Sequence, residues 1–280
     1  MSPPERTVRY GRANHVVKQV VIYIDKSRLK SVVMSTKRLG KFGEFVKQYE
    51  KARRSYPPEV LRFLKSLIKV KNPKILDIGC GTGISTRQLK NIGEVTGVDP
   101  DPKMLKAARA HKSKVKIYVL AKAEKLPFKS QTFDIVTAFS ALHWFDDKKS
   151  LLEIKRVLKP GGLFFVGGHT GSISWGKYRN AIIEAIGQEI AQFKSVKFNP
   201  KKLLIGSGFK KVKVRLWNKK EYYTLKNAIE YVQSVSIWQS VPRSLRQKAL
   251  KGVEEYFKNI LRNYGKIERK LIVKVVAGIK

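Results

Sequence analysis

Residues 74–83 constrain the fold of this chain more than any other stretch, because they join a short apolar run to three glycines spaced two apart. The run at residues 75–78 is broken only by Asp77 and has the length of a buried strand. Glycine tolerates the backbone angles of a sharp turn and lets the backbone approach a ligand. A stretch with helical character begins near Ile84. The pattern therefore predicts a strand, a tight turn and a helix, as at the nucleotide sites of open α/β folds.

A second strand narrows the kind of ligand that this turn accepts. Residues 94–99 end in Asp99, about twenty residues after Gly79, where open α/β folds place the acid that binds ribose hydroxyls. Dinucleotides and S-adenosylmethionine both carry an adenosine ribose. A dinucleotide turn reads Gly-x-Gly-x-x-Gly, with a phosphate at the helix N-terminus, whereas this one reads Gly-x-Gly-x-Gly. With Asp77 at its start, the turn resembles motif I of the class I S-adenosylmethionine-dependent methyltransferases.

The segment before the turn resembles the small-molecule branch of this family, around the trans-aconitate and the ubiquinone and menaquinone methyltransferases. It contains Tyr49, then Arg53, then Tyr56 and Pro57. A spacing of four places Tyr49 and Arg53 on one face of a helix. The resemblance implies that this face lies over the methionine end of the cofactor, with Arg53 paired to the cofactor's carboxylate. Packing of Tyr49 and Tyr56 onto the core is the alternative interpretation.

Residues 121–128 resemble the family's Ala-Glu-x-Leu-Pro-Phe segment, whose backbone lies against the adenine. Many relatives have an aspartate where this chain has Lys122, so contacts from the backbone and from Glu124 are expected instead. The resemblance covers about residues 45–168 and implies S-adenosylmethionine as the cofactor. It places the following residues at the cofactor: Tyr49, Arg53, Asp77, Gly79, Cys80, Gly81, Thr82, Gly83, Asp99, Pro100, Ala123, Glu124 and Ser140.

Methyl transfer is an in-line displacement in which the protein mainly holds the nucleophile near the methyl carbon. A carboxylate nucleophile needs no general base, whereas a phenol, an alcohol or a carbon acid usually does. His143 lies in a turn that resembles the family's Ala-x-His-Trp and is the candidate catalytic residue, with packing or loop anchoring as the alternative. His169, after the fifth strand, is a second candidate base. His15 and His111 are expected at the surface, and no metal ligands are predicted.

Hydrophobic periodicity extends the strand and helix pattern along the chain. Further strands are predicted at residues 115–120, 133–139, 163–166, 211–217 and 270–276, and helices at residues 58–68, 102–110, 148–158, 178–193, 200–205, 225–238 and 244–263. The expected fold class is α/β: a doubly wound, mostly parallel, seven-stranded sheet of the Rossmann-like methyltransferase type, with an antiparallel edge strand and a helical cap. Apolar residues at helical spacing over residues 231–238 predict a core face, with a substrate-pocket wall as the alternative.

Three parts are expected along the chain. Residues 1–33 form an N-terminal extension of unknown role, residues 34–168 form the cofactor-binding core with its lead-in helix, and residues 169–280 complete the sheet and insert the cap. Met34 opens a stretch that looks like a natural start, and every family-like feature follows it. The extension is therefore expected to be dispensable for folding and cofactor binding, although residues 16–24 predict a strand.

Composition indicates the compartment. The single cysteine, Cys80, rules out an intrachain disulfide and fits a reducing, cytoplasmic location. Cys80 is expected to be a small packed residue of the turn rather than a reactive thiol. No run of 18 apolar residues occurs, so neither a membrane span nor a secretory signal is predicted.

Charge bears on the partner. Lys and Arg total 59 against 21 Asp and Glu, which gives a formal net charge of +38. Such a charge attracts nucleic acid, anionic membranes and acidic ligands. Basic residues nevertheless occur throughout the chain, as on the Lys-rich surfaces of some thermophiles.

The first functional hypothesis is methylation of an oxygen or carbon of a small, anionic or lipid-like acceptor, with weak and non-specific binding to nucleic acid. The alternatives are an RNA-directed methyltransferase, a cofactor-binding protein without catalysis, and a dinucleotide oxidoreductase. Residues 140–143 lack the Asp/Asn-Pro-Pro-aromatic motif of amine methyltransferases, and pyrimidine C5 methylation needs a cysteine outside the turn. Both observations disfavour RNA. The sequence names neither the acceptor nor the oligomeric state.

Overall fold

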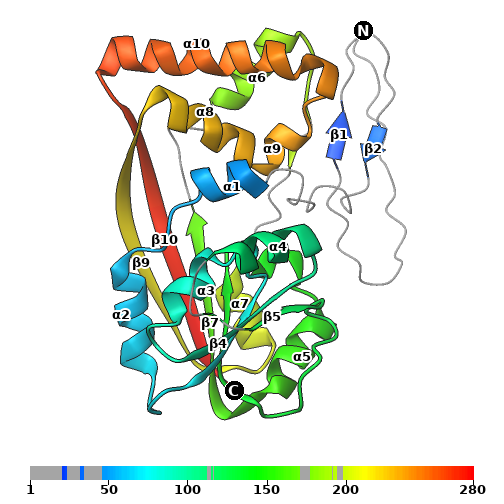
Figure 1. Cartoon of the computed structure of the whole chain (residues 1–280), viewed down its shortest axis with the longest axis vertical. Coiled ribbons are helices and arrows are strands. Elements are labelled where there is room, and N and C mark those ends of the chain that lie inside the picture. Colours follow the sequence, from blue (N-terminus) through cyan, green and yellow to red (C-terminus); the bar gives the residue numbers. More distant parts are fainter. Residues whose placement is uncertain are drawn as a thin grey trace, which may run out of the picture.

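The computed structural model describes residues 21–23, 32–34, 46–111, 115, 117–170, 177–190, 192–193 and 198–280. A seven-stranded sheet with the order β5-β4-β3-β6-β7-β10-β9 forms its centre (Figure 1). Its strands are β3 (Lys74–Ile78), β4 (Glu94–Asp99), β5 (Ile117–Leu120), β6 (Phe133–Phe139), β7 (Leu158–Thr170), β9 (Lys210–Tyr223) and β10 (Ile267–Ile279).

The sheet has a parallel part and an antiparallel edge. Strands β5, β4, β3, β6 and β7 pair in parallel, whereas β10 runs antiparallel to both β7 and β9. Parallel strands are connected by helices that cross over the faces of the sheet, so their carboxyl ends meet at one edge. The predicted fold class is confirmed.

Two hydrophobic layers follow from the alternation of side chains along the strands. Ile75 and Ile135 pack with α2 (Pro58–Leu67) and α3 (Ile84–Leu89) on one face. Leu76 and Val136 pack with α5 (Lys148–Val157) and α7 (Pro200–Gly206) on the other. The helix α4 (Pro102–Ala110) packs Leu105 and Ala108 against Cys80 and Tyr118.

A helical cap with its own core lies beyond the carboxyl edge of the sheet (Figure 1). It consists of α6 (Tyr178–Ile186), α8 (Leu225–Ser234), α9 (Ser236–Gln239), the short 3-10 helix at Arg243–Leu245 and α10 (Arg246–Tyr264). The lead-in helix α1 (Val46–Ala52) packs against α8, and Ala52 joins the cap core. The long strands β9 and β10 extend into the cap, where Tyr223 and Ile267 are buried in the same core.

Several elements differ in length from the sequence prediction. The helix expected at residues 178–193 ends at Ile186, because Gly187 adopts φ +74° and caps it, and β8 (Gln192–Phe193) follows. The helix expected at residues 225–238 is broken at Val235, which is extended. The strand β7 begins at Leu158, earlier than predicted, with an irregularity in pairing where the Pro-Gly-Gly sequence occurs. Strands β9 and β10 are also longer than predicted, because they continue into the cap.

The N-terminal part contributes two described strands. β1 (Val21–Tyr23) pairs antiparallel with β2 (Val32–Met34) and with β8. The rest of the strand expected at residues 16–24 lies outside the described residues. The expected boundary at Met34 falls within β2, so the first two parts of the chain share a strand. None of the helices that the structure describes is long and apolar enough to cross a membrane.

Candidate functional site

The glycine turn after β3 has the geometry that its sequence predicts. Gly79 has φ +69°, and a Cβ there would lie 2.5 Å from the Ala141 Cβ. Gly83 has φ +80°, and a Cβ there would lie 2.6 Å from the Tyr118 hydroxyl. The amides of Gly79 and Cys80 both donate to the Val98 carbonyl, at 2.8 and 3.0 Å. Glycine is therefore required at these two positions both by backbone angle and by space.

Asp77 is fully buried below this turn and holds three elements together. Its carboxylate accepts hydrogen bonds from Ser85 Oγ (2.9 Å), Thr86 Oγ1 (2.8 Å) and Thr137 Oγ1 (2.7 Å), which come from α3 and β6. Burial raises the pKa of Asp77 to about 6, against the three hydrogen bonds that lower it. The structure shows Asp77 as a support for the turn, and its contact with a cofactor stays a prediction.

Asp99 lies at the end of β4 and faces the turn. Its Oδ2 accepts from the Gly81 amide and its Oδ1 from the Asp101 amide, both at 2.9 Å. The side chain is 8% exposed, and burial raises its pKa. Each carboxylate oxygen has a second lone pair, so Asp99 can accept two further hydrogen bonds. Pro100, the next residue, is exposed.

Cys80 and Thr82 are buried within the turn. Burial raises the pKa of the Cys80 thiol well above its usual value, as the interpretation of a packed, unreactive cysteine requires. Thr82 Oγ1 is buried without a hydrogen-bond partner in the described part of the chain. A polar atom of this kind is expected to have a partner in the functional state.

Helix α1 is fixed over the turn through Glu50. The Glu50 carboxylate pairs with Arg87 of α3 (3.5 Å) and with His111 Nε2. Arg87 Nη1 also donates to the Thr82 carbonyl at 2.7 Å. His111 is 40% exposed, as expected of a surface residue, but it also anchors the lead-in. The sequence reasoning missed Glu50, because its partners lie far away along the chain.

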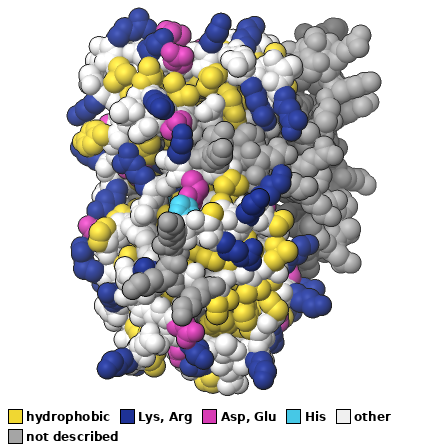
Figure 2. Space-filling view, viewed as in Figure 1, with side chains coloured by type: hydrophobic (Ala, Val, Ile, Leu, Met, Phe, Trp, Pro, Cys, Tyr) yellow, Lys and Arg dark blue, Asp and Glu magenta, His cyan; other side chains and the backbone are white. Residues whose placement is uncertain are grey.

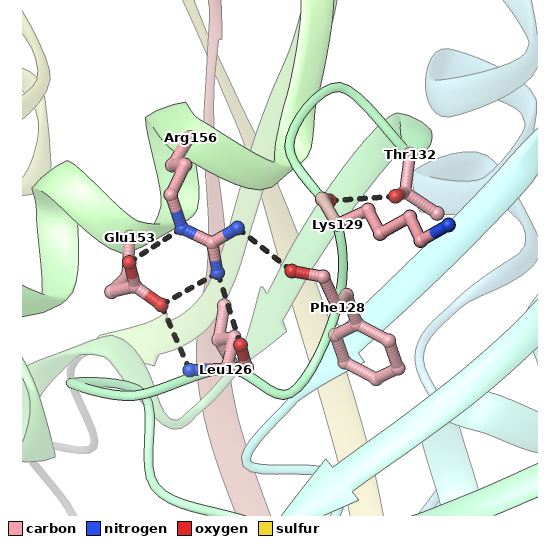
Figure 3. Close-up of polar contacts among 6 residues, drawn as sticks. All are labelled: Leu126, Phe128, Lys129, Thr132, Glu153 and Arg156. Atoms are coloured by element: carbon pink, nitrogen blue, oxygen red, sulfur yellow. Dashed lines mark hydrogen bonds and ion pairs between the residues drawn. The ribbon is translucent and has the colours of Figure 1, made fainter.

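Two side chains of α5 hold the predicted adenine segment (Figure 3). Arg156 donates to the carbonyls of Phe128 (2.7 Å) and Leu126 (3.0 Å) and pairs with Glu153 (2.7 Å). Glu153 in turn accepts from the Leu126 amide at 2.9 Å. Within the segment, Ala123 is buried and the neighbouring Glu124 is half-buried. The sequence reasoning missed this clamp, because its acceptors are backbone groups and leave no signal of residue type.

Arg156→Ala should loosen this segment. Loss of charge-assisted hydrogen bonds to two carbonyls should lower the free energy of unfolding by about 2 kcal/mol. Chemical denaturation measures the loss. Arg262→Ala is the control, because Arg262 is 69% exposed and its ion pair with Glu255 is 3.7 Å long. Equal losses in the two variants would contradict the clamp.

The loop after β6 lies beside the end of β7. Ser140 has φ +52°, donates its amide to the Gly167 carbonyl (2.7 Å) and shares a 2.6 Å hydrogen bond with the Tyr56 hydroxyl. The Tyr56 ring is buried and stacks on His169, with centroids 4.8 Å apart. A non-glycine residue with positive φ is uncommon and marks a position worth examining for function. Tyr56 thus joins the predicted Ser140 to His169.

The two candidate histidines differ in their surroundings. His143 lies in the 3-10 helix Leu142–Trp144, is exposed, and packs against the rings of Trp144 and Phe198. His169 is half-buried near the end of β7. The surrounding protein atoms reduce the solvation of a charged imidazole, and this, together with the positive charge of Arg53, lowers the pKa of His143 to about 4. The pKa of His169 falls to about 4 for the same reason, with Arg269 and Arg53 adding to it. Both are therefore neutral at neutral pH.

A ladder of guanidinium groups and tyrosine rings joins the lead-in to the cap. The Cζ atom of Arg53 lies 5.2 Å from the centroid of the Tyr49 ring and 5.7 Å from that of the Tyr231 ring. The Cζ atom of Arg269, on β10, lies 4.2 Å from the centroid of the Tyr231 ring. Arg53 Nε is buried without a hydrogen-bond partner among the described residues. Tyr231 also belongs to the cap core, as the prediction of a core face requires, yet it lies in the site as well. The sequence reasoning missed Arg269.

The predicted residues thus converge on one edge of the sheet. The glycine turn, Asp99, Ser140 and His169 lie at the carboxyl ends of adjacent parallel strands, under α1 and the cap. Open α/β sheets bind ligands in the crevice at this edge. The arrangement suits a ligand with a ribose at Asp99 and an anionic group at Arg53.

Comparisons with known proteins agree with this geometry. A family described as "Methyltransferase domain" matches residues 76–166. An uncharacterized methyltransferase of Mycobacterium tuberculosis is 38% identical over 122 residues, which are 43% of this chain and 49% of the relative. A demethylmenaquinone methyltransferase of Chlorobaculum parvum is 37% identical over 99 residues, 34% of this chain and 41% of the relative. The matches therefore span about half or less of the length of these relatives.

A solved structure extends the likeness to the fold as a whole. Phosphoethanolamine N-methyltransferase 2 of Haemonchus contortus, solved with S-adenosylhomocysteine, has a TM-score of 0.51 and is 21% identical. It covers 90% of this chain, and this chain covers 62% of it. The resemblance seen in the sequence is confirmed over residues 76–166, which match a methyltransferase domain, and the solved structure shows the same fold.

Proposed function

We propose that this chain is an S-adenosylmethionine-dependent methyltransferase that methylates an oxygen or carbon atom of a small-molecule acceptor. The observation that carries the proposal is the hydrogen bond that the Gly81 amide donates to the Asp99 carboxylate beneath α1. This contact fixes a buried carboxylate against a turn whose glycines, having no side chain, would let a ligand approach the backbone.

The residues present fit the cofactor. Asp99 has lone pairs for the two ribose hydroxyls, and the buried Arg53 Nε is a donor that a cofactor carboxylate would satisfy. The backbone at Ala123 and Glu124, just before the carbonyls of Leu126 and Phe128 that Arg156 holds, would lie along the adenine. When bound, S-adenosylmethionine supplies a methyl group on a sulfonium that is already a good leaving group.

The chain's own residues then orient the acceptor and exclude water. Helix α1 and the cap cover the edge of the sheet, so an acceptor held beneath them is kept in position, the effect that this displacement needs most. Neutral His143 and His169 can each accept a proton from an alcohol, a phenol or a carbon acid. We keep His143 as the candidate catalytic residue of the predicted turn. The relative from Chlorobaculum parvum, named for a menaquinone precursor, supports a small acceptor.

RNA is the second candidate acceptor, because the net charge of +38 favours it. Figure 2 shows Lys and Arg side chains over both the upper and the lower part of one face, rather than in a single patch. Such a distribution gives weak binding without sequence preference that falls steeply with salt. In a covered site, salt screens the electrostatic interactions with a small acceptor less than it screens those on an exposed surface, so methylation there should depend less on salt.

The test has two readouts. Calorimetry should show binding of S-adenosylhomocysteine and no tighter binding of NAD. Incubation with methyl-labelled cofactor should label small molecules of a cell extract at both low and moderate salt, while RNA stays unlabelled. Tighter binding of NAD than of S-adenosylhomocysteine would overturn the proposal that the chain transfers methyl groups. Labelled RNA, together with salt-resistant and sequence-selective binding, would make RNA the acceptor.

A further inference from the structure

The cap end of the guanidinium–tyrosine ladder is not used by the cofactor contacts proposed above. Tyr231 of α8 lies between Arg53 and Arg269, so two cations flank one ring. Arg53 serves the cofactor in the proposed function. Arg269, on β10, remains as a second, largely buried cation whose side chain is 12% exposed.

Arg269 is held in a fixed position by β9. Its Nη1 lies 3.4 Å from Glu221 Oε2, and Glu221 also accepts a 2.7 Å hydrogen bond from the Tyr223 hydroxyl. The pairing of β9 with β10 places Glu221 directly opposite Arg269, on one face of the sheet. A guanidinium positioned by a carboxylate and stacked on a ring loses little freedom on binding an anion, and its planar donors match an oxyanion.

His169 lies near the end of β7, on the same face of the sheet as Arg269, because it is paired with Val273 and residues an even number apart share a face. It pairs with Val273 on β10, four residues from Arg269, and stacks on Tyr56. The charged groups that reach it are Arg269 from β10 and Arg53 from the end of the lead-in helix. His169 thus lies between the cofactor side of the site and the cap side.

We propose that the methyl acceptor carries an oxyanion, a carboxylate or a phosphate, that binds Arg269, and that His169 on the same face of the sheet accepts the proton of the acceptor's nucleophile. This inference rests on the proposed function. Tyr178 of α6, which packs against the cap core that contains Tyr231, would border the bound anion.

The chemical step balances without a further reactant. The acceptor's oxygen or carbon forms a bond to the methyl carbon, while the bond from that carbon to sulfur breaks and its electron pair stays on sulfur. The proton of the acceptor goes to the free nitrogen of the neutral His169 imidazole and then to water. A bound oxyanion offsets the positive charges of Arg269 and Arg53, which disfavour protonation of His169. Binding of the correct acceptor would therefore make His169 a stronger base.

The experiment uses the full chain with S-adenosylhomocysteine and follows the imidazole of His169 by NMR as pH is varied. The probes are inorganic phosphate in one arm and succinate in the other, with chloride at equal ionic strength as reference. In the wild type, we expect the pKa of His169 to rise from about 4 toward the usual 6.5 in at least one arm. Response to phosphate or to succinate distinguishes the two kinds of oxyanion.

Arg269→Met should raise the pKa of His169 without any anion and should abolish the response to both probes. Lys270→Met is the matched control: Lys270 is the next residue on β10, is exposed, and points to the other face of the sheet. It should respond like the wild type. If Arg269→Met fails to fold, the double variant Glu221→Gln with Arg269→Met, which leaves no unpaired carboxylate, carries the same test.

A pKa of His169 that ignores both anions in the wild type would overturn the inference, as would an unchanged response in Arg269→Met. Calorimetry of S-adenosylhomocysteine on the same samples reports separately on the proposed function. Failure to bind it would count against the cofactor assignment, whereas the response of His169 to phosphate or succinate would still be readable.

Discussion

Asp99→Ala should weaken binding of S-adenosylhomocysteine by about 10- to 150-fold, because hydrogen bonds to a charged group contribute about 1.5–3 kcal/mol. The structure adds a second cause. Both oxygens of Asp99 also accept from the amides of Gly81 and Asp101, so the substitution releases the turn as well as the ribose. Calorimetry should use S-adenosylhomocysteine, which lacks the positive charge of the sulfonium cofactor. The measured loss of affinity then excludes any lost attraction between the Asp99 carboxylate and that positive charge.

Asp101→Ala is the matched control, two residues away. Asp101 caps α4 by accepting from the amides of Lys103 and Met104. Its loss should lower stability by about 1 kcal/mol while affinity stays unchanged. Asp99→Asn should also lose affinity, because its amide nitrogen would face one of the backbone donors. Wild-type affinity in Asp99→Ala would show that the ribose is bound elsewhere.

The parallel core of the sheet could be predicted from the sequence because its signals are local. The residues 133–139 and 102–110 were predicted with the bounds that β6 and α4 have, since each combines a periodic run with clear ends. The glycine turn was predicted for the same reason: φ values near +70° leave glycine as the fitting residue.

The cap side of the site could not be predicted in this way. Arg269 and Glu221 meet only because β9 and β10 pair across 48 residues of chain, and a lone arginine in a strand carries no motif. The clamp of Arg156 on backbone carbonyls leaves no trace in residue type. Breaks such as the extended Val235 depend on packing within the cap, which overrides the local preference for helix.

Asp77→Asn should remove a large contribution to the pH dependence of stability. Burial raises the pKa of Asp77 from 3.8 to about 6. The unfolded chain then releases this proton at lower pH than the folded protein, so the contribution of Asp77 to stability is lost as pH rises from about 4 to about 6. A difference of roughly two pH units corresponds to about 3 kcal/mol in all.

Asparagine fits the site, which makes the variant informative. Its oxygen can accept from Ser85 and Thr86 as the carboxylate does. Its nitrogen can donate to Thr137 Oγ1, whose own proton has the Leu76 carbonyl nearby at 3.5 Å. The variant should therefore fold. Because asparagine does not ionise, its stability should lack the pH-dependent contribution of Asp77.

The comparison must be made between variant and wild type, because His143 and His169 act in the opposite direction. Their folded pKa values, about 4, lie below the usual 6.5, so the stability they contribute is lost as pH falls through this range. Subtracting the wild-type curve from that of Asp77→Asn cancels both histidines. Urea unfolding at pH 5 and pH 7 should show the variant gaining about 1 kcal/mol on the wild type over that interval. Glu94→Gln, at the exposed start of β4, should show no such gain, and a flat difference for Asp77→Asn would mean that the three hydroxyls keep the buried carboxylate ionised at low pH.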